Sequence, residues 1–223
     1  KPPSVMNKTL PLLGAALEAG VAEMGLALSE PQFEQLLRYL MELDKWNRAY
    51  NLSAVRDVNA MVSRHILDSL SVLPHLRTFK PATAIDVGTG AGLPGIPLAI
   101  AFPECRFTLL DSAGKKTRFL FHVATTLGLD NVRVENRRVE TYQPDTLYPV
   151  VLSRAFASLA DMTSSCAHLL SHSGVFLAMK GQYPSDELTE IEAHYNVVGV
   201  HSLFVPDTEG ERHLVVLQAP SGA

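Results

Sequence analysis

The stretch Asp86-Val87-Gly88-Thr89-Gly90-Ala91-Gly92-Leu93-Pro94-Gly95 decides how this chain folds. It begins inside a short strand-like run, 84–87, and leads into an apolar run that ends near Ala101. The glycines let the backbone turn sharply and let a ligand approach it closely. The N–H groups at the start of a helix are free to bind a polar ligand. The stretch therefore predicts a strand, a tight ligand-binding turn and a helix.

Downstream of this turn, the hydrophobic pattern alternates between strand and helix. Further helices are expected over residues 115–127, 158–170 and 186–194. Strands are expected over residues 84–87, 106–111, 132–135, 150–153, 174–180, 197–205 and 213–218. Such alternation favours an α/β fold with a doubly wound, mostly parallel seven-stranded sheet covered on both faces.

Residues 1–80 show helical spacing instead. Ser29 and Gln32 have the spacing of a capping box, and Pro31 suits a first helical turn. Asp57 is a second candidate cap, followed by apolar residues at helical spacing. We therefore expect an N-terminal helical segment (1–80) and an α/β domain (81–223).

Composition narrows the class of protein. Of the 223 residues, 47% are hydrophobic and 19% are charged, which excludes a disordered chain. The net charge of −4 disfavours a protein that coats nucleic acid nonspecifically. Cys105 and Cys166 are too few for a disulfide framework or a cysteine zinc site, and no metal site is expected. The sequence contains neither a membrane-span pattern nor a signal peptide, so we expect a cytoplasmic protein with reduced thiols.

Two cofactors compete for the glycine-rich turn. Gly90, Gly92 and Gly95 have the spacing of a dinucleotide fingerprint, with Asp111 about twenty residues further on. The alternative is S-adenosylmethionine, which suits an acidic residue inside the first strand (Asp86) and another ending the second. A buried carboxylate is costly unless it is paired. The donor's methionine ammonium would pair with Asp86 directly or through water, whereas pyrophosphate would be repelled, so we favour S-adenosylmethionine.

A wider set of motifs resembles one family. The motifs are Trp46-Asn47-x-x-Tyr50-Asn51-Leu52, His65-Ile66-Leu67-Asp68-Ser69, the turn Asp86 to Gly95, Leu110-Asp111-Ser112-x-Gly114-Lys115, Arg138-Val139-Glu140, Ser153-Arg154-Ala155-Phe156-Ala157, Met179-Lys180-Gly181 and Gly210-Glu211-Arg212-His213. Over about residues 30–217 they resemble the bacterial small-subunit ribosomal RNA guanine-N7 methyltransferases, the glucose-inhibited division protein B family. The resemblance implies a Rossmann-like class I S-adenosylmethionine-dependent methyltransferase fold. It also implies methylation of N7 of one guanine in the decoding-region loop of 16S ribosomal RNA.

The resemblance also implies cofactor contacts. Gly88 and Leu93 are expected to place backbone groups around the donor's methionine end, with Gly90 in the same turn. Asp111 is expected to accept the ribose hydroxyls, although it could instead cap the following helix. Val139 and Glu140, after the third strand, are expected to contact the adenine, although Glu140 could simply be solvated.

Three basic residues are the candidates for catalysis. Residues 139–223 contain only Arg154, Lys180 and Arg212 as basic residues, against ten acidic ones. All three lie at expected sheet edges beside loops, with Arg154 next to the point of methyl transfer and to the cofactor. We expect them to contact O6 of the target guanine or the flanking phosphates; the alternative is a solvated surface.

Two further groups are candidates for RNA binding. Arg64, His65 and Asp68 lie within one helical turn, and His65 and Asp68 should share a face. They either contact RNA or form a His65–Asp68 hydrogen bond that holds the helix, and Asn51 and Ser53 are candidates to line the same cleft. The second group is a basic segment, which is an RNA footprint or an ordinary solvated face. It comprises Lys115, Lys116, Arg118, Arg133, Arg137 and Arg138.

Methylation at guanine N7 agrees with the absence of a general-base motif from the sequence. N7 has an in-plane lone pair and carries no proton, so its attack needs no general base. The expected substrate is 16S ribosomal RNA or the small ribosomal subunit, and the expected state is a monomer. The competing hypotheses are an NAD-dependent oxidoreductase, a non-enzymatic RNA-binding or ribosome assembly factor, and a small-molecule methyltransferase.

Overall fold

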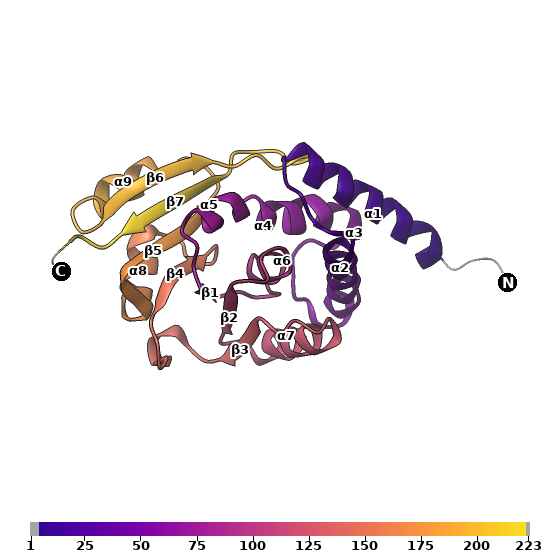
Figure 1. Ribbon diagram of the computed structural model, residues 1–223, viewed down its shortest axis with the longest axis horizontal. Coiled ribbons are helices and arrows are strands. Elements are labelled where there is room, and N and C mark those ends of the chain that lie inside the picture. The colour runs from indigo at the N-terminus through magenta and orange to yellow at the C-terminus, as the bar shows by residue number, and fades with distance from the viewer. Residues whose placement is uncertain (1–4, 222–223) are drawn as a thin grey trace.

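A computed structural model describes residues 5–221 and places a seven-stranded sheet at the centre of the molecule (Figure 1). The strand order is β3-β2-β1-β4-β5-β7-β6. β7 runs antiparallel to both neighbours, and the other strands run parallel to one another. The strands are β1 (Thr83–Val87), β2 (Arg106–Asp111), β3 (Val132–Asn136), β4 (Tyr148–Ser153), β5 (Leu170–Lys180), β6 (Asn196–Ser202) and β7 (His213–Gln218). This confirms the mostly parallel sheet that the alternating pattern predicts.

The chain is helical before its first strand. The N-terminal elements are α1 (Val5–Glu23), α2 (Glu30–Tyr50), α3 (Val58–Met61), the π-helical turn η1 (Val62–Leu67), α4 (Asp68–Leu70) and α5 (Leu73–Thr78). Ser29 caps α2 in a complete capping box with Gln32, and Asp57 caps α3, as predicted. No helix within residues 5–221 is both long and apolar enough to cross a membrane.

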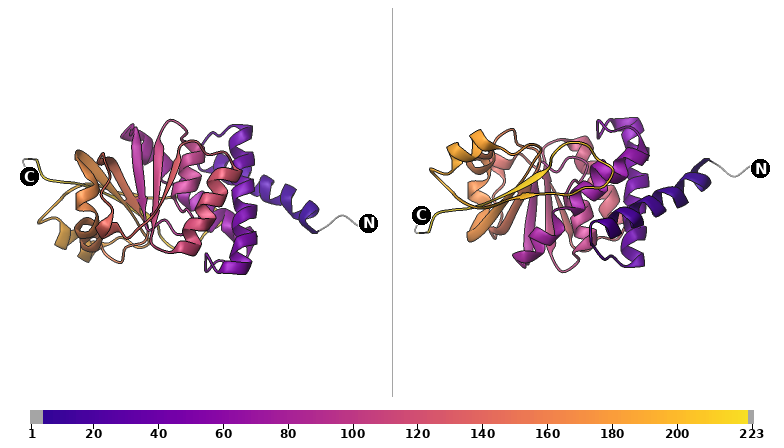
Figure 2. Two further views of the ribbon diagram at one scale, coloured as in Figure 1. Left: turned by 90° about the horizontal axis from the view of Figure 1, so that it is seen from below. Right: turned by 90° about the horizontal axis from the view of Figure 1, so that it is seen from above.

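The remaining helices connect the strands. They are α6 (Gly95–Ala101), α7 (Gly114–Thr126), the 3₁₀ turn η2 (Val139–Thr141), α8 (Leu159–Cys166), the 3₁₀ turn η3 (Ala167–Leu169) and α9 (Ser185–Ile191). Alternate residues of each strand face opposite sides, so the sheet has two apolar faces. α6, α7 and the N-terminal helices cover one face, and α8 and α9 cover the other (Figures 1 and 2).

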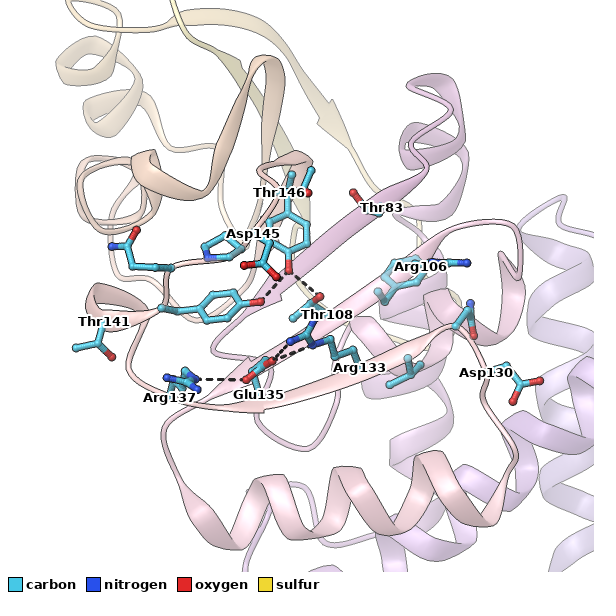
Figure 3. A pocket seen from close by; sticks show the side chains of 17 residues that line it. Thr83, Arg106, Thr108, Asp130, Arg133, Glu135, Arg137, Thr141, Asp145 and Thr146 are labelled. Atoms are coloured by element: carbon cyan, nitrogen blue, oxygen red, sulfur yellow. Dashed lines mark hydrogen bonds and ion pairs between the residues drawn. The ribbon is translucent and has the colours of Figure 1, made fainter.

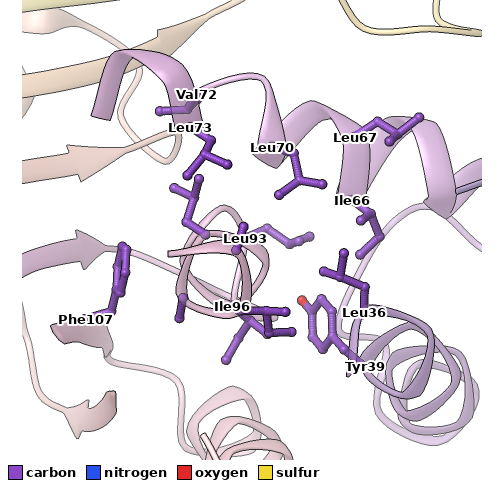
Figure 4. Packing of buried hydrophobic residues seen from close by; sticks show 14 of the residues in the cluster. Leu36, Tyr39, Ile66, Leu67, Leu70, Val72, Leu73, Leu93, Ile96 and Phe107 are labelled. Carbon is purple, nitrogen blue, oxygen red and sulfur yellow. The ribbon is translucent and has the colours of Figure 1, made fainter. Parts of the chain in front are cut away.

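The N-terminal helices share one hydrophobic core with the sheet. Leu36 and Tyr39 of α2 pack with Ile66 of η1 and with Ile96 of α6, as Figure 4 shows. Leu93 of the glycine-rich turn lies in the same cluster. This shared core holds the turn against the N-terminal helices. The division into residues 1–80 and 81–223 as separate units stays a prediction.

Several expected boundaries are wrong. The helix that starts after Ser158 was expected to reach Leu170, but α8 ends at Cys166, and β5 begins at Leu170 rather than at Gly174. The residues 171–173 that open β5 are polar and at least partly exposed, so they show no alternation of apolar and polar side chains. At the other end of the sheet, β6 stops at Ser202 instead of continuing to Val205.

Candidate active site

The glycine-rich turn lies at the carboxyl end of β1. Gly88, Gly90 and Gly92 all have positive φ angles, of 68°, 61° and 97°, which favour glycine. The N–H groups of Gly88 and Thr89 both donate to the carbonyl oxygen of Leu110, at 2.9 and 3.1 Å. These bonds fasten the turn to the end of β2. The strand order reverses between β1 and β4, and ligands of such sheets bind beside that point.

The buried Asp86 side chain, in β1, bonds to the glycine-rich turn. One carboxylate oxygen, Oδ2, accepts hydrogen bonds from the Thr89 hydroxyl at 2.7 Å and from the Gly95 N–H at 2.9 Å. The other, Oδ1, is buried and has no hydrogen-bond partner among the described residues. This oxygen fits a ligand that brings a positive charge to the turn, as the donor's ammonium does. Because Asp86 has no exposed surface, the indirect route to that ammonium is favoured over direct contact.

We expect an Asp86→Asn variant to lose part of the pH dependence of folding. Burial raises the pKa of the Asp86 carboxyl to about 7, against the opposing effects of Thr89, Gly95 and Arg154. Between the ordinary pKa and 7, native Asp86 keeps a proton that the unfolded chain has released. The free energy of unfolding of the wild type should therefore fall by about 2–3 kcal/mol between pH 5 and pH 7 because of this group.

The measurement is urea unfolding at pH 5, 6, 7 and 8. Asp86→Asn should have the flatter profile, and Asp130→Asn, which changes an exposed carboxylate, should follow the wild type. Parallel profiles for the wild type and Asp86→Asn would show that Asp86 is ionised throughout this range.

Asp111 ties together the turn and the start of α7. Its two carboxylate oxygens accept from the Gly90 N–H at 2.8 Å and from the Ala113 N–H at 2.9 Å. The side chain is half-buried at the end of β2. It therefore makes local structural bonds, but it is not the cap of α7, whose N-cap residue is Ala113 without a side-chain cap bond. Its contact with the ribose stays a prediction.

Val139 and Glu140 lie in η2, directly after β3. The Val139 carbonyl contacts the His168 ring nitrogen Nε2 at 3.0 Å, and Glu140 is exposed. The carboxyl ends of β2 and β3 are adjacent, since Asp111 pairs with Asn136. The expected ribose and adenine contacts therefore lie on neighbouring strand ends.

The three basic candidates belong to ion pairs. Arg154 directly follows β4, and its Nη1 lies 3.4 Å from Asp68 Oδ2. Arg212, just before β7, places Nε 2.8 Å from Asp68 Oδ1. Lys180 ends β5 and pairs with Glu187 at 2.8 Å. Asp68 therefore joins two of the three residues, a contact that the sequence did not predict.

His65 and Asp68 have different hydrogen-bond partners in the described part of the chain, so the alternative of a His65–Asp68 hydrogen bond is not seen there. His65 contacts Ser53 Oγ through Nε2 at 2.6 Å and the Arg64 carbonyl through Nδ1 at 3.1 Å. Both residues lie at the π-helical turn η1, where the Asp68 N–H donates to the carbonyls of His65 and of Ser63, five residues earlier. The Asp68 side chain instead pairs with Arg154 and Arg212. Burial lowers the pKa of His65 to about 4, so its ring is neutral at pH 7.

The basic segment divides into two parts. Lys115, Lys116 and Arg118 lie on α7, where Lys116 Nζ approaches Gly90, and Arg138 is exposed just before η2. Arg64, from the other candidate group, is exposed on η1. Arg133 and Arg137 pair with Glu135 at 2.8 and 3.4 Å. These three side chains border a separate cavity of about 630 Å³ over β2 and β3, with Tyr142, Tyr148 and Thr108 hydrogen-bonded beside them (Figure 3). The pairing with Glu135 reduces the positive charge available there.

Tyr39 is a site residue that the sequence analysis missed. Its hydroxyl donates to the carbonyl of Ala91 in the glycine-rich turn at 2.7 Å, although 52 residues separate the two. Burial raises the pKa of Tyr39. A tyrosine at a helical core position gives no local signal that its hydroxyl reaches a distant turn. α2 therefore supports the turn as directly as β1 does.

Solved structures with a similar fold define the class of protein. N-methyltransferase NodS from Bradyrhizobium japonicum WM9, in complex with S-adenosyl-L-homocysteine, aligns with a TM-score of 0.57 at 10% identity, covering 80% of this chain and 100% of that chain. An S-adenosylmethionine-dependent methyltransferase from Aquifex aeolicus aligns with a TM-score of 0.53 at 16% identity, covering 69% and 93%. At these identities the likeness concerns the fold alone. The fold is that of the class I S-adenosylmethionine-dependent methyltransferases.

Sequence relatives give the family. The GidB profile, described as rRNA small subunit methyltransferase G, matches residues 32–215. A "Ribosomal RNA small subunit methyltransferase G" from Cellvibrio japonicus is 60% identical over 96% of this chain and 98% of its own length. The protein of that name from Alteromonas mediterranea is 52% identical over 92% and 96%. The chain belongs to the GidB family of small-subunit rRNA methyltransferases, as the motifs predicted.

Proposed function

We propose that this protein methylates N7 of one guanine in the decoding-region loop of 16S ribosomal RNA, with S-adenosylmethionine as methyl donor. The observation that carries the proposal is membership of the GidB family over residues 32–215. The glycine-rich turn, with its buried Asp86, fits the donor on independent grounds. Family membership argues against an NAD-dependent oxidoreductase.

When bound, S-adenosylmethionine would supply an electrophilic methyl group: the N7 lone pair would form the new C–N bond, and the sulfur would keep the electrons of the broken C–S bond. The turn residues Gly88, Gly90 and Leu93 hold the methionine end, supported by Asp86. Asp111 holds the ribose, and Val139 and Glu140 contact the adenine. N7 carries no proton, so the chain needs to supply orientation rather than a base.

Arg154, Lys180 and Arg212 contact the target guanine or its flanking phosphates, and Arg154 also borders the cofactor. Arg64, Lys115, Lys116 and Arg138 form the surrounding RNA-binding surface, and the buried His65 and Asp68 support it from the helical segment beneath. The partner is the small ribosomal subunit or its free RNA, and the enzyme acts as a cytoplasmic monomer. Because the net charge is −4 and the basic patch is modest, the protein recognises folded RNA with an exposed guanine.

The test uses donor with a tritiated methyl group and undermethylated small ribosomal subunits. Labelled positions are then mapped by cleavage specific for N7-methylguanine. One labelled guanine in the decoding-region loop is expected. Donor binding without label on subunits or on free 16S RNA would overturn the substrate assignment and favour an assembly factor or a small-molecule methyltransferase.

A further inference from the structure

A small pocket lies between the N-terminal helices and the carboxyl ends of β4 and β5. Its volume is about 250 Å³. Residues from five separate segments line it, including Asp68, Arg154, Met179, Lys180, Leu203 and Arg212. Pockets for drug-sized ligands begin at about 300 Å³, so this one suits a single planar ring rather than a larger group.

The pocket borders the cofactor turn. The Ser153 hydroxyl donates to the Val87 carbonyl at 2.7 Å, which fixes the end of β4 against the end of β1. Ala155 then packs against Gly88 so closely that a Cβ on Gly88 would lie 2.7 Å from the Ala155 methyl group. Arg154 lies between these two contacts. A ring held beside Arg154 is therefore next to the turn that holds the donor's methionine end.

Asp68 fixes the two arginines without using up their hydrogen-bonding capacity. It binds Arg212 through Nε and Arg154 through Nη1, at 2.8 and 3.4 Å. Arg212 Nη1 also donates to Thr208 Oγ1 and the Glu209 carbonyl, so Arg212 is held on two sides. A guanidinium has five N–H donors, and the Asp68 contact uses one from Arg154. Arg154 thus keeps donors for a ligand.

The charges of the pocket balance. Arg154, Lys180 and Arg212 are matched by Asp68, Glu209 and Glu211 in the lining, and Lys180 also pairs with Glu187. A phosphate would favour a pocket with surplus positive charge. A neutral ring with both donors and acceptors on its edge fits a balanced pocket better. A ring that becomes positively charged in the reaction gains from the carboxylates.

A wider groove of about 760 Å³ adjoins this pocket and shares Arg154, Met179 and Lys180 with it. Phe156 and the exposed Tyr183 line the groove. Flanking nucleotides could follow the groove while one base enters the pocket, because aromatic side chains stack on bases of any sequence.

We propose that this pocket receives the target guanine ring, and that Asp68 is a positioning residue that orients Arg154 and Arg212 toward the ring and offsets the charge that N7 methylation creates. The inference rests on the proposed function. It specifies where the base binds, and it assigns the pocket to the base rather than to a phosphate. Through Asp68, it also involves the N-terminal helical segment in the reaction.

The first test is steady-state methylation by Asp68→Asn. We expect kcat to fall about 10- to 100-fold, while KM for RNA and the affinity for S-adenosylmethionine stay within about threefold. Rates are expressed per donor-binding site, so that misfolded protein does not count. Asp68→Glu, which keeps the charge, should recover part of the rate. Glu135→Gln is the matched control, because Glu135 also bridges two arginines but lies in the other cavity.

The second test needs no variant of the pocket. Binding of guanosine 5′-monophosphate, 7-methylguanosine 5′-monophosphate and ribose 5-phosphate to the wild type with S-adenosylhomocysteine is followed by NMR. Both guanine nucleotides should bind more tightly than ribose 5-phosphate, by at least about fivefold. Equal binding of all three would make the pocket a phosphate site and overturn the proposal.

The outcomes separate this inference from the proposed function. Absence of rRNA methylation by the wild type would overturn the proposed function. Normal methylation by the wild type, with Asp68→Asn within threefold of its kcat, would overturn the role of Asp68 alone. If Asp68→Asn does not fold, Asp68→Glu and the nucleotide binding decide.

Discussion

Replacing Gly88 by alanine is expected to weaken binding of S-adenosylmethionine at least about tenfold, or 1.4 kcal/mol. Two effects combine at this position. The φ angle of 68° costs an L-residue about 1–2 kcal/mol. The new Cβ would also lie 2.7 Å from the Ala155 methyl group, so the turn and the end of β4 would have to separate. Calorimetric titration with the donor measures the loss.

Gly128→Ala is the matched control for Gly88→Ala. Gly128 has a similar φ angle, 62°, but a Cβ there meets no atom within 4 Å. It should lower the free energy of unfolding by about 1 kcal/mol and leave donor affinity unchanged. The double variant Gly88→Ala/Ala155→Gly removes the crowding and should recover part of the affinity. Equal donor affinities for Gly88→Ala and the wild type would show that the turn does not hold the donor.

Arg154→Ala is expected to reduce kcat for rRNA methylation at least about 100-fold, which corresponds to about 2.7 kcal/mol. Arg154 lies between β4 and the contact of Ala155 with Gly88, and it pairs with Asp68. Its loss removes a charged donor from the substrate pocket and leaves Asp68 with one arginine. The reduction in kcat should exceed any reduction in donor affinity. Single-turnover methylation of undermethylated subunits separates the chemical step from RNA binding.

Arg38→Ala is the control for Arg154→Ala. Arg38 is an exposed arginine on α2 that donates to the Thr126 carbonyl at 3.0 Å, at the end of α7 remote from the turn. It should methylate at the wild-type rate. An Arg154→Ala enzyme with a rate within threefold of wild type would remove Arg154 from the catalytic machinery. Retained cellular function of Arg154→Ala without any methyl transfer would favour the assembly-factor hypothesis.

Local patterns predicted most of the fold. The bounds of β2 and β7 agree with the predicted strands, because their apolar runs end at polar or charged residues. The capping box at Ser29 also formed as predicted, because its bonds join residues only three apart. Elements without such a pattern were missed, including the polar start of β5 and the π-helical turn at Val62–Leu67.

The candidate site could be predicted in part. The glycine-rich turn could be predicted because three closely spaced glycines allow the positive φ angles that a tight turn needs. The partners of Asp86 were not predicted, although Thr89 and Gly95 lie within the quoted stretch. A buried carboxylate in a strand can be paired by a ligand or by its own turn, and the sequence does not show that Thr89 and Gly95 reach Asp86.

By itself the sequence determined the succession of strands and helices along the chain, the glycine-rich cofactor turn and the family. These depend on local periodicity and on motifs. Only the tertiary structure decided which charged side chains form ion pairs. Asp68 lies 86 residues from Arg154 and 144 residues from Arg212, yet it pairs with both. An ion pair depends on distance in space, and that distance is set when the N-terminal helices pack on the sheet.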